Sequence, residues 1–239
     1  MKNTTIKIYA NLSPERNEAI FSGIKFADFI ECTPTPIENI LMLSPTNIGE
    51  KYYHNFEIFE GKDDIAKLEL ENIYHYGDFH FVDYANTVNS VTKEQVSELL
   101  YLAHMYEPLK TPFFDTLQNN YAYLSHDDGW YCKLFCKEWQ TSTSILLNKL
   151  LKCIQRTFCD NVHSLPEGLA EEITELSTRG LLIQLDVKTQ KGKPAHKNKF
   201  ATIKLFEVGE YEDMDKLFSN LENILSEAIP NGIYYIKRR

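Results

Sequence analysis

The amino-acid sequence predicts an α+β protein with a mainly antiparallel sheet, built from recurrent β-hairpin–helix units with the helices packed on one face. Two patterns predict this class. Runs of alternating apolar and polar residues flank short turns that contain Gly, which is typical of β-hairpins. Stretches with apolar residues three or four positions apart follow these runs, which indicates amphipathic helices. The composition, 43% hydrophobic and 13% aromatic, is that of a chain that folds around a core.

Turn residues mark the predicted hairpins. Gly77 and Asp78 separate two alternating runs, and Asp128 and Gly129 separate two others, because these residue types accept the backbone angles of tight turns. A Lys-rich loop around Gly192 joins a third pair. The predicted strands lie at 6–10, 37–43, 53–60, 67–76, 79–84, 121–125, 130–139, 181–187, 200–208 and 232–237.

Helix starts are predicted from capping residues. Thr92 and Gln95 form the pattern of a capping box, and Ser164 with Glu167 repeats it, while Ser13 precedes a proline at a first helical position. Leu150 belongs to an apolar stripe that we expect to face the core. The predicted helices lie at 14–31, 92–107, 145–158, 164–180 and 213–228.

The chain length permits one large domain or two small ones. Pro108 and Pro112 interrupt the helical pattern and suggest a boundary. We therefore expect an N-terminal α+β half at 1–108 and a C-terminal α+β half at 109–239, or one continuous domain.

Composition excludes several classes of protein. A net charge of −9 argues against general nucleic-acid binding, and no apolar run approaches the roughly 18 residues needed to cross a membrane. Five cysteines without a C-x-x-C pair are typical of reduced thiols, and with no apolar leader segment they predict a cytoplasmic protein. The Walker A, dinucleotide-binding and zincin motifs are missing, so the sequence predicts no cofactor.

One candidate site lies on the first hairpin. A two-residue turn at Gly77 and Asp78 would place His75 opposite His80, with Cβ atoms about 5 Å apart on a half-exposed sheet face. Two imidazoles at that distance can share a divalent metal, with Asp78, Glu71 or His126 as candidates for a further ligand. The alternative is a pair of histidines on a solvated face with no metal.

A second candidate is the tip of the next hairpin, which contains His126, Asp128 and Trp130. The same counting places His126 opposite Tyr131 and Ser125 opposite Cys132. Successive strand residues point to opposite faces, so His126 does not activate the Cys132 thiol. Turn chemistry is the alternative interpretation of the polar residues here.

A third candidate is the basic loop. Five lysines between Lys188 and Lys199 carry a local charge of +5, and Lys191, Lys193, His196 and Lys197 are its candidate binding residues. With Lys237, Arg238 and Arg239 the two segments carry +8, so the rest of the chain carries −9 − 8 = −17. A solvated connection is the alternative interpretation.

These observations favour a non-enzymatic binding or regulatory module with a protein or small-molecule partner. The alternative is a metal-assisted hydrolase, or another small-molecule enzyme, that uses His75, Asp78, His80, His126 and Asp128 at the two hairpin tips.

Overall fold

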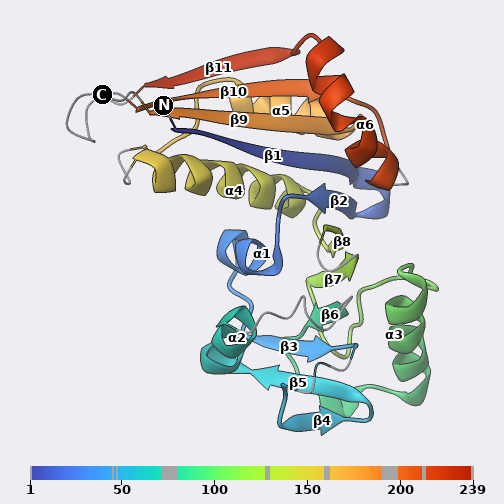
Figure 1. The fold of residues 1–239 in the computed structure, drawn as a ribbon. Coiled ribbons are helices and arrows are strands. Elements are labelled where there is room, and N and C mark those ends of the chain that lie inside the picture. The colour runs from blue at the N-terminus through green and yellow to red at the C-terminus, as the bar shows by residue number, and fades with distance from the viewer. Residues whose placement is uncertain are drawn as a thin grey trace.

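The computed structural model describes residues 2–44, 46, 48–70, 80–126, 130–158, 162–189, 199–211 and 214–237. Its strands form one sheet of eleven strands, ordered β11-β10-β9-β1-β2-β8-β7-β6-β3-β5-β4, and all neighbours are antiparallel (Figure 1). The strands are β1 (Lys2–Ser13), β2 (Glu18–Ser22), β3 (Asn39–Met42), β4 (Lys51–Tyr53), β5 (Phe56–Glu60), β6 (His80–Asp83), β7 (Tyr121–His126), β8 (Tyr131–Cys136), β9 (Leu181–Thr189), β10 (Lys199–Glu207) and β11 (Gly232–Lys237). The α-helices are α1 (Phe26–Cys32), α2 (Gly61–Leu70), α3 (Lys93–Met105), α4 (Gln140–Phe158), α5 (Leu169–Ser177) and α6 (Met214–Glu227). The predicted α+β class with an antiparallel sheet is confirmed.

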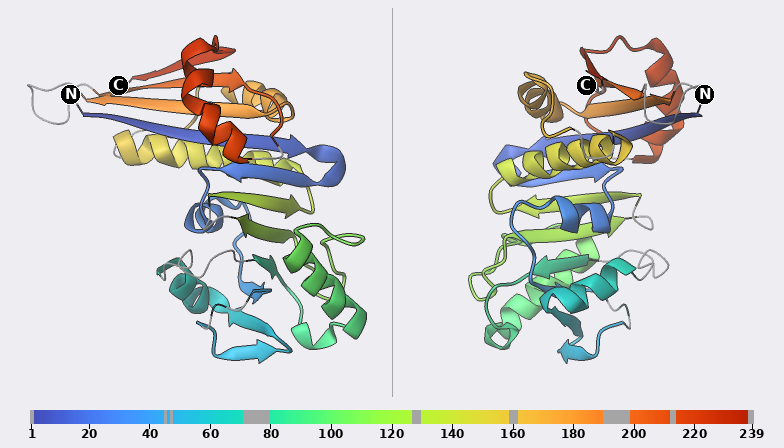
Figure 2. Two further views of the ribbon diagram at one scale, coloured as in Figure 1. Left: turned by 45° about the vertical axis from the view of Figure 1, so that its right-hand side comes forward. Right: turned by 90° about the vertical axis from the view of Figure 1, so that its left-hand side faces the viewer.

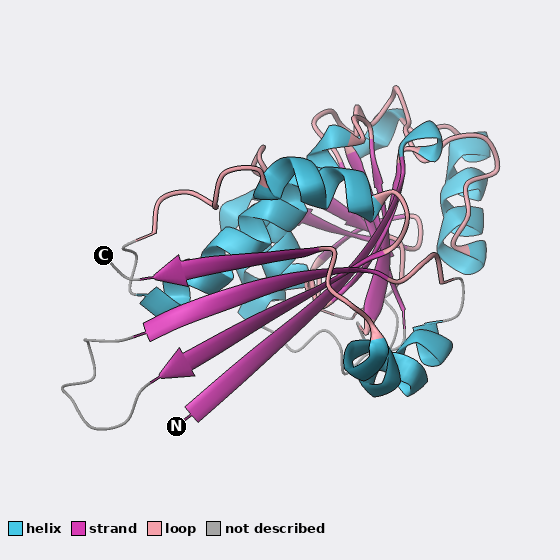
Figure 3. Cartoon of the chain, turned by 90° about the horizontal axis from the view of Figure 1, so that it is seen from above, coloured by secondary structure: helices cyan, strands magenta, loops and turns pink. Residues whose placement is uncertain are grey.

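The sheet interleaves distant parts of the chain. The N-terminal hairpin β1–β2 lies in the middle, with β9 beside β1 and β8 beside β2. Seen from above, the strands turn progressively from one edge of the sheet to the other (Figure 3), as the right-handed twist of strands requires.

Helices cover both faces of the sheet. Alternate strand residues point to opposite faces, and the buried residues of α1, α2, α4 and α5 join one set, which we call the α4 face. The buried residues of α3 and α6 join the other set, which we call the α6 face. Figure 2 shows α5 and α6 on opposite sides of the C-terminal strands. The prediction of helices on one face therefore holds for four helices, and α3 and α6 depart from it.

Aromatic rings fill the core under α1. Phe29 of α1 lies 5.0 Å from Tyr123 and 5.5 Å from Tyr121 between ring centroids, and Phe81 stacks on Tyr123 at 5.2 Å. Phe26 meets Phe81 edge to face. All five side chains are buried, so this cluster attaches α1 to the sheet.

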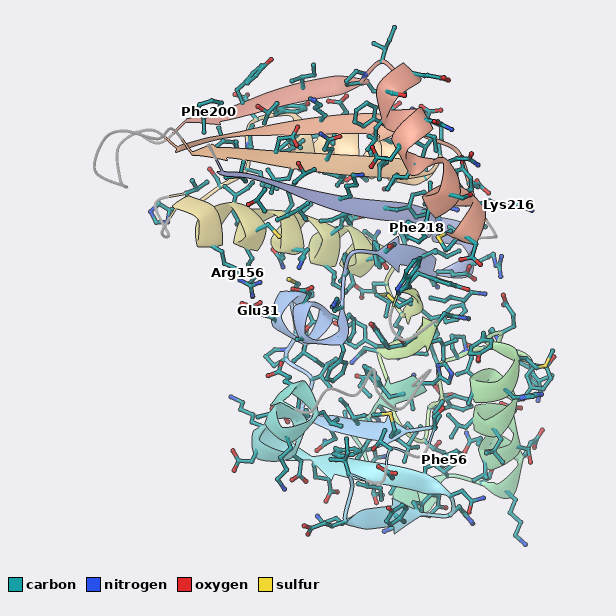
Figure 4. The ribbon with its side chains drawn as sticks, in the orientation of Figure 1. Glu31, Phe56, Arg156, Phe200, Lys216 and Phe218 are labelled. Atoms are coloured by element: carbon teal, nitrogen blue, oxygen red, sulfur yellow. The ribbon has the colours of Figure 1, made fainter. Side chains whose placement is uncertain are left out.

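Ion pairs attach α1 to α4. The buried Lys149 ammonium lies 2.5 Å from the Asp28 carboxylate. At the surface, Arg156 pairs with Glu31 at 2.5 Å, and Figure 4 shows these two side chains meeting between the helices. The short α1 is thus held by charge as well as by its rings.

The predicted helix at 14–31 is wrong over its first half. After a 3-10 turn at Pro14–Arg16, Asn17 takes a φ of +52° and the chain returns as β2. Gly23, with a φ of +85°, then turns the chain into α1, and a Cβ here would lie 2.5 Å from the Lys7 carbonyl oxygen. The apolar residues of this segment are buried on both faces of the central strand β2. Their spacing in the sequence therefore resembles that of an amphipathic helix.

The predicted strand at 67–76 is also wrong where it is described. Lys67 to Leu70 form the last turn of α2, because Ile65 and Leu68 are spaced by three and both bury against the sheet. Residues 71–79, including the predicted Gly77 turn, lie outside the described residues.

Other predicted units are confirmed. Hairpin β7–β8 precedes α4, and the strands β9 and β10 precede α6. Thr92 and Gln95 form the capping box of α3, and Leu150 is fully buried. The box predicted at Ser164 is wrong, because α5 begins later, after Gly168 in a left-handed conformation.

Candidate functional site

The candidate site lies on the α6 face, over the central strands between α3 and α6. We call it the central face and define it by four aromatic-ring residues and four charged residues. They are His80, Tyr106, His126 and Tyr131, and Arg16, Glu18, Glu107 and Lys133. Alternation along β2, β6, β7 and β8 presents these strand residues on one side, and register places Tyr131 between Ser22 and His126.

The end of α3 completes the central face. Tyr106 follows the last helical residue with a φ of +56°, and its N–H caps the helix on the Leu102 carbonyl oxygen. This left-handed residue ends the helix, and it brings Tyr106 and Glu107 against side chains of the sheet.

The aromatic residues form a continuous row. The ring centroid of Tyr106 lies 4.9 Å from that of His80 and 4.1 Å from that of His126. His126 stacks on Tyr131 at 4.5 Å with an angle of 9° between the rings. The neighbouring Trp130 is 58% exposed and meets Phe218 of α6 at 5.2 Å. Figure 4 shows Phe218 on the side of α6 toward the central strands.

The charged residues form a connected chain of ion pairs. Arg16 lies 2.9 Å from Glu18 and 3.2 Å from Glu107, and Lys133 also pairs with Glu107. Glu18 is 5% exposed. Burial raises the pKa of the Glu18 carboxyl, and the nearby cations Lys133 and Arg16 oppose that rise. These four residues neutralise one another, which suits a fixed surface better than proton transfer.

Three predicted site residues belong to this region. His126 lies in the central face, and Trp130 lies at its margin. His80 also joins it, with its ring centroid 6.4 Å from that of His126. The prediction that His80 is half-exposed is wrong, because β6 lies between β3 and β7 and Tyr106 covers it, leaving His80 2% exposed.

The remaining predicted site residues are not placed. His75, Asp78, Asp128, Lys191, Lys193, His196 and Lys197 lie outside the described residues. The first hairpin site, the second hairpin tip and the basic loop therefore stay predictions at these positions.

Metal and thiol chemistry find little support in the described ranges. Within them, no group of three or more His, Cys, Asp or Glu side chains is arranged to hold a metal ion. The predicted register is confirmed, with Ser125 opposite Cys132 and His126 opposite Tyr131. Burial raises the pKa of the Cys132 and Cys136 thiols to about 12 each, so neither is a thiolate near neutral pH.

An exposed apolar surface adjoins the central face. We call it the α3 strip: Leu100, Tyr101, Met105 and Leu109, which are 37% to 55% exposed. The first five residues of α3 expose Lys93, Glu94 and Ser97 instead, so the exposed apolar residues are confined to the half of the helix that leads to Tyr106.

Most residues of the central face could not be predicted from the sequence. Glu18 falls in the segment predicted as a helix, and no local pattern marks Glu107 or Lys133 as its neighbours. The α3 strip did leave a signal. Four successive large apolar residues, at 99–102, are more than one buried stripe of a helix uses.

No known family, curated protein or solved structure matches this chain. No helix in the described part of the chain has both the length and the hydropathy to cross a membrane.

Proposed function

We propose that this chain is a non-enzymatic, cytoplasmic protein-binding module. Its partner protein docks on the central face together with the α3 strip and Trp130. The observation that carries the proposal is the exposure of large apolar side chains around a self-neutralised polar network. Exposed large apolar side chains mark recognition surfaces, in which Tyr, Trp, Met and Arg are enriched.

The anchors of this surface are of the types that dominate binding energies. Trp130 and Tyr101 are both exposed by more than a third, and each brings a large rigid ring. The Arg16–Glu107 and Lys133–Glu107 pairs fix the polar residues between them, so little side-chain freedom is left to lose on binding.

Charge indicates the kind of partner. Outside the basic loop and the last three residues, the chain carries −17. An acidic body attracts a basic protein over distances of about a Debye length. We therefore propose a partner with an apolar contact patch surrounded by Lys and Arg. The cytoplasmic location is supported by Cys32, Cys132 and Cys136, which are buried thiols outside any disulfide.

Site-specific photo-crosslinking in native cells tests the proposal. A photo-reactive amino acid at Tyr101 should capture one recurring basic protein, and the same probe at Tyr52, an equally aromatic exposed site on β4, should not. With the purified partner, Met105→Glu and Trp130→Ala should each weaken affinity at least about tenfold, and added salt should weaken it further.

The matched control variant is Ile229→Glu, because Ile229 is 89% exposed and follows α6 rather than α3. It should leave affinity unchanged. The proposal is wrong if Tyr101 captures no recurring protein, or if the captured partner binds Met105→Glu and Trp130→Ala as tightly as the unaltered chain.

A further inference from the structure

The outer edge of β11 stands apart from the central face. β11 pairs with β10 from Leu205–Gly232 to Phe200–Lys237, and no described strand pairs with its other side (Figure 1). Edge strands with free backbone groups recruit further strands unless they are short, charged or interrupted. The opposite edge, β4, is protected in this way, since it has three residues and begins with Lys51.

β11 lacks such protection. Its first five residues, 232–236, contain no charge and no proline. On the α6 face, Ile233 is 46% and Tyr235 68% exposed, and Ile229 just before the strand is 89% exposed. On the α4 face, Ile236 is buried. The edge therefore combines open backbone groups with uncovered apolar side chains.

Acidic side chains of α5 lie beneath the start of β11. The Glu172 carboxylate lies against Gly232 and accepts a hydrogen bond from the Tyr234 hydroxyl. Glu171 adds to the negative field that Tyr234 feels. Both carboxylates lie on the α4 face with α5, away from the exposed Ile233 and Tyr235 on the α6 face.

We propose that β11 pairs with β11 of a second copy of this chain, antiparallel and about a two-fold axis. Antiparallel pairing sets the exposed Ile233 and Tyr235 of each copy against those of the other. A second copy supplies the same apolar edge in both directions, as an isologous contact must. Each sheet then continues into the other, and the contact leaves the central face and the α3 strip uncovered.

The symmetry restricts the register. A two-fold axis perpendicular to the sheet keeps both faces in place, so directly opposed residues must belong to the same face. If the axis passes through the Tyr234 pair, Ile233 of each copy lies opposite Tyr235 of the other copy. This register covers both exposed apolar side chains with an aromatic–β-branched pair, which antiparallel sheets favour.

Sedimentation of the full chain tests the proposal. The unaltered protein should dimerise with rising concentration in a range on the order of 1–100 µM, as suits a small interface. Tyr235→Lys should weaken dimerisation at least about tenfold by adding charge to the edge. Tyr52→Lys on β4 is the matched control, because it alters an exposed aromatic at the other edge, and it should have no effect.

Cysteine crosslinking tests the register. Mild oxidation of the double variant Ile233→Cys/Tyr235→Cys should give a disulfide-linked dimer, since opposed residues lie within disulfide distance. A chain that stays monomeric throughout this range overturns the proposal. A dimer that Tyr235→Lys leaves intact, or one that the double variant fails to crosslink, also overturns it. So does the finding that β11 pairs with a strand of another protein and not with a second copy of this chain.

Discussion

The Asp83 carboxylate accepts the backbone N–H of Tyr121 over 2.6 Å and also that of Asn120 over 2.9 Å. These bonds tie the end of β6 to the start of β7. Burial nevertheless raises the pKa of Asp83 from its ordinary 3.8 to about 6, because desolvation outweighs the two hydrogen bonds. The stabilisation from protonated Asp83 is therefore present below about pH 4 and is lost as the pH rises through about 6.

Replacing Asp83 by Asn tests this shift. Asn keeps an oxygen for the two N–H donors and cannot ionise. From about pH 5 to about pH 8, we expect the free energy of unfolding of Asp83→Asn to rise by about 1–2 kcal/mol relative to the unaltered protein. Urea denaturation at both pH values measures this difference. Asp63→Asn, at an exposed position, should show no such change, and a pH-independent difference at Asp83 would contradict the expectation.

Gly180 is predicted to be the least replaceable glycine among those described. Its φ is +80°, and a Cβ at this position would lie 1.8 Å from the Gly209 carbonyl oxygen. Gly61 has the same φ with nothing within 4 Å. Gly61→Ala should therefore cost about 1–2 kcal/mol through backbone strain alone. Gly180→Ala should cost more than about 3 kcal/mol, because the backbone must also move. If thermal or urea unfolding showed equal losses of stability for the two variants, the backbone at Gly209 would have to move away from the new Cβ without cost.

The Asp28–Lys149 pair is predicted to matter through its burial. Asp28→Ala leaves the Lys149 ammonium buried without its carboxylate and also removes the acceptor of the Lys25 N–H at the start of α1. We expect a loss of about 2–4 kcal/mol. Lys149→Met, which removes the cation, should cost less. Glu31→Ala breaks the more exposed pairs with Arg156 and Lys152 and should cost no more than about 1 kcal/mol. A different order of losses in urea unfolding would contradict this assignment.

Leu150 tests the α4 face of the core. Its side chain is fully buried between α4 and the sheet, so Leu150→Ala should cost about 2–5 kcal/mol. Ile229→Ala removes apolar atoms at an 89% exposed position and should change stability by less than about 0.5 kcal/mol. Calorimetry of the two variants gives the comparison. A loss below about 1 kcal/mol at Leu150 would mean that α4 presents another side to the sheet.

The sequence predicted those elements whose signals are local. The capping box at Thr92, the strands 181–187 and 200–208 and the helix beginning near Met214 depend on neighbours in the chain, and all are present. The error at 14–31 has a physical cause. β2 is buried on both faces, so its apolar run has no two-residue period, and only Asn17 and Gly23 mark the turns around it.

The site was less predictable, because it is assembled from distant segments. The pairing of His126 with Tyr131 follows from one hairpin and was predicted correctly. Tyr106 meets His126 only because α3 ends in a left-handed residue, and Glu107 meets Arg16 across 91 positions. The spacing of residues along the sequence does not predict such contacts, because they depend on the order of the strands in the sheet.

The central place of β1 has a consequence for the newly made chain. Tyr9 forms its first sheet contacts with β2, yet its other neighbour, Leu182, is synthesised far later. Until β9 has been synthesised, one edge of β1, the longest of the described strands, lacks its native partner strand and is available for incorrect pairing. The sheet can therefore be completed only after the residues of β9 have been synthesised.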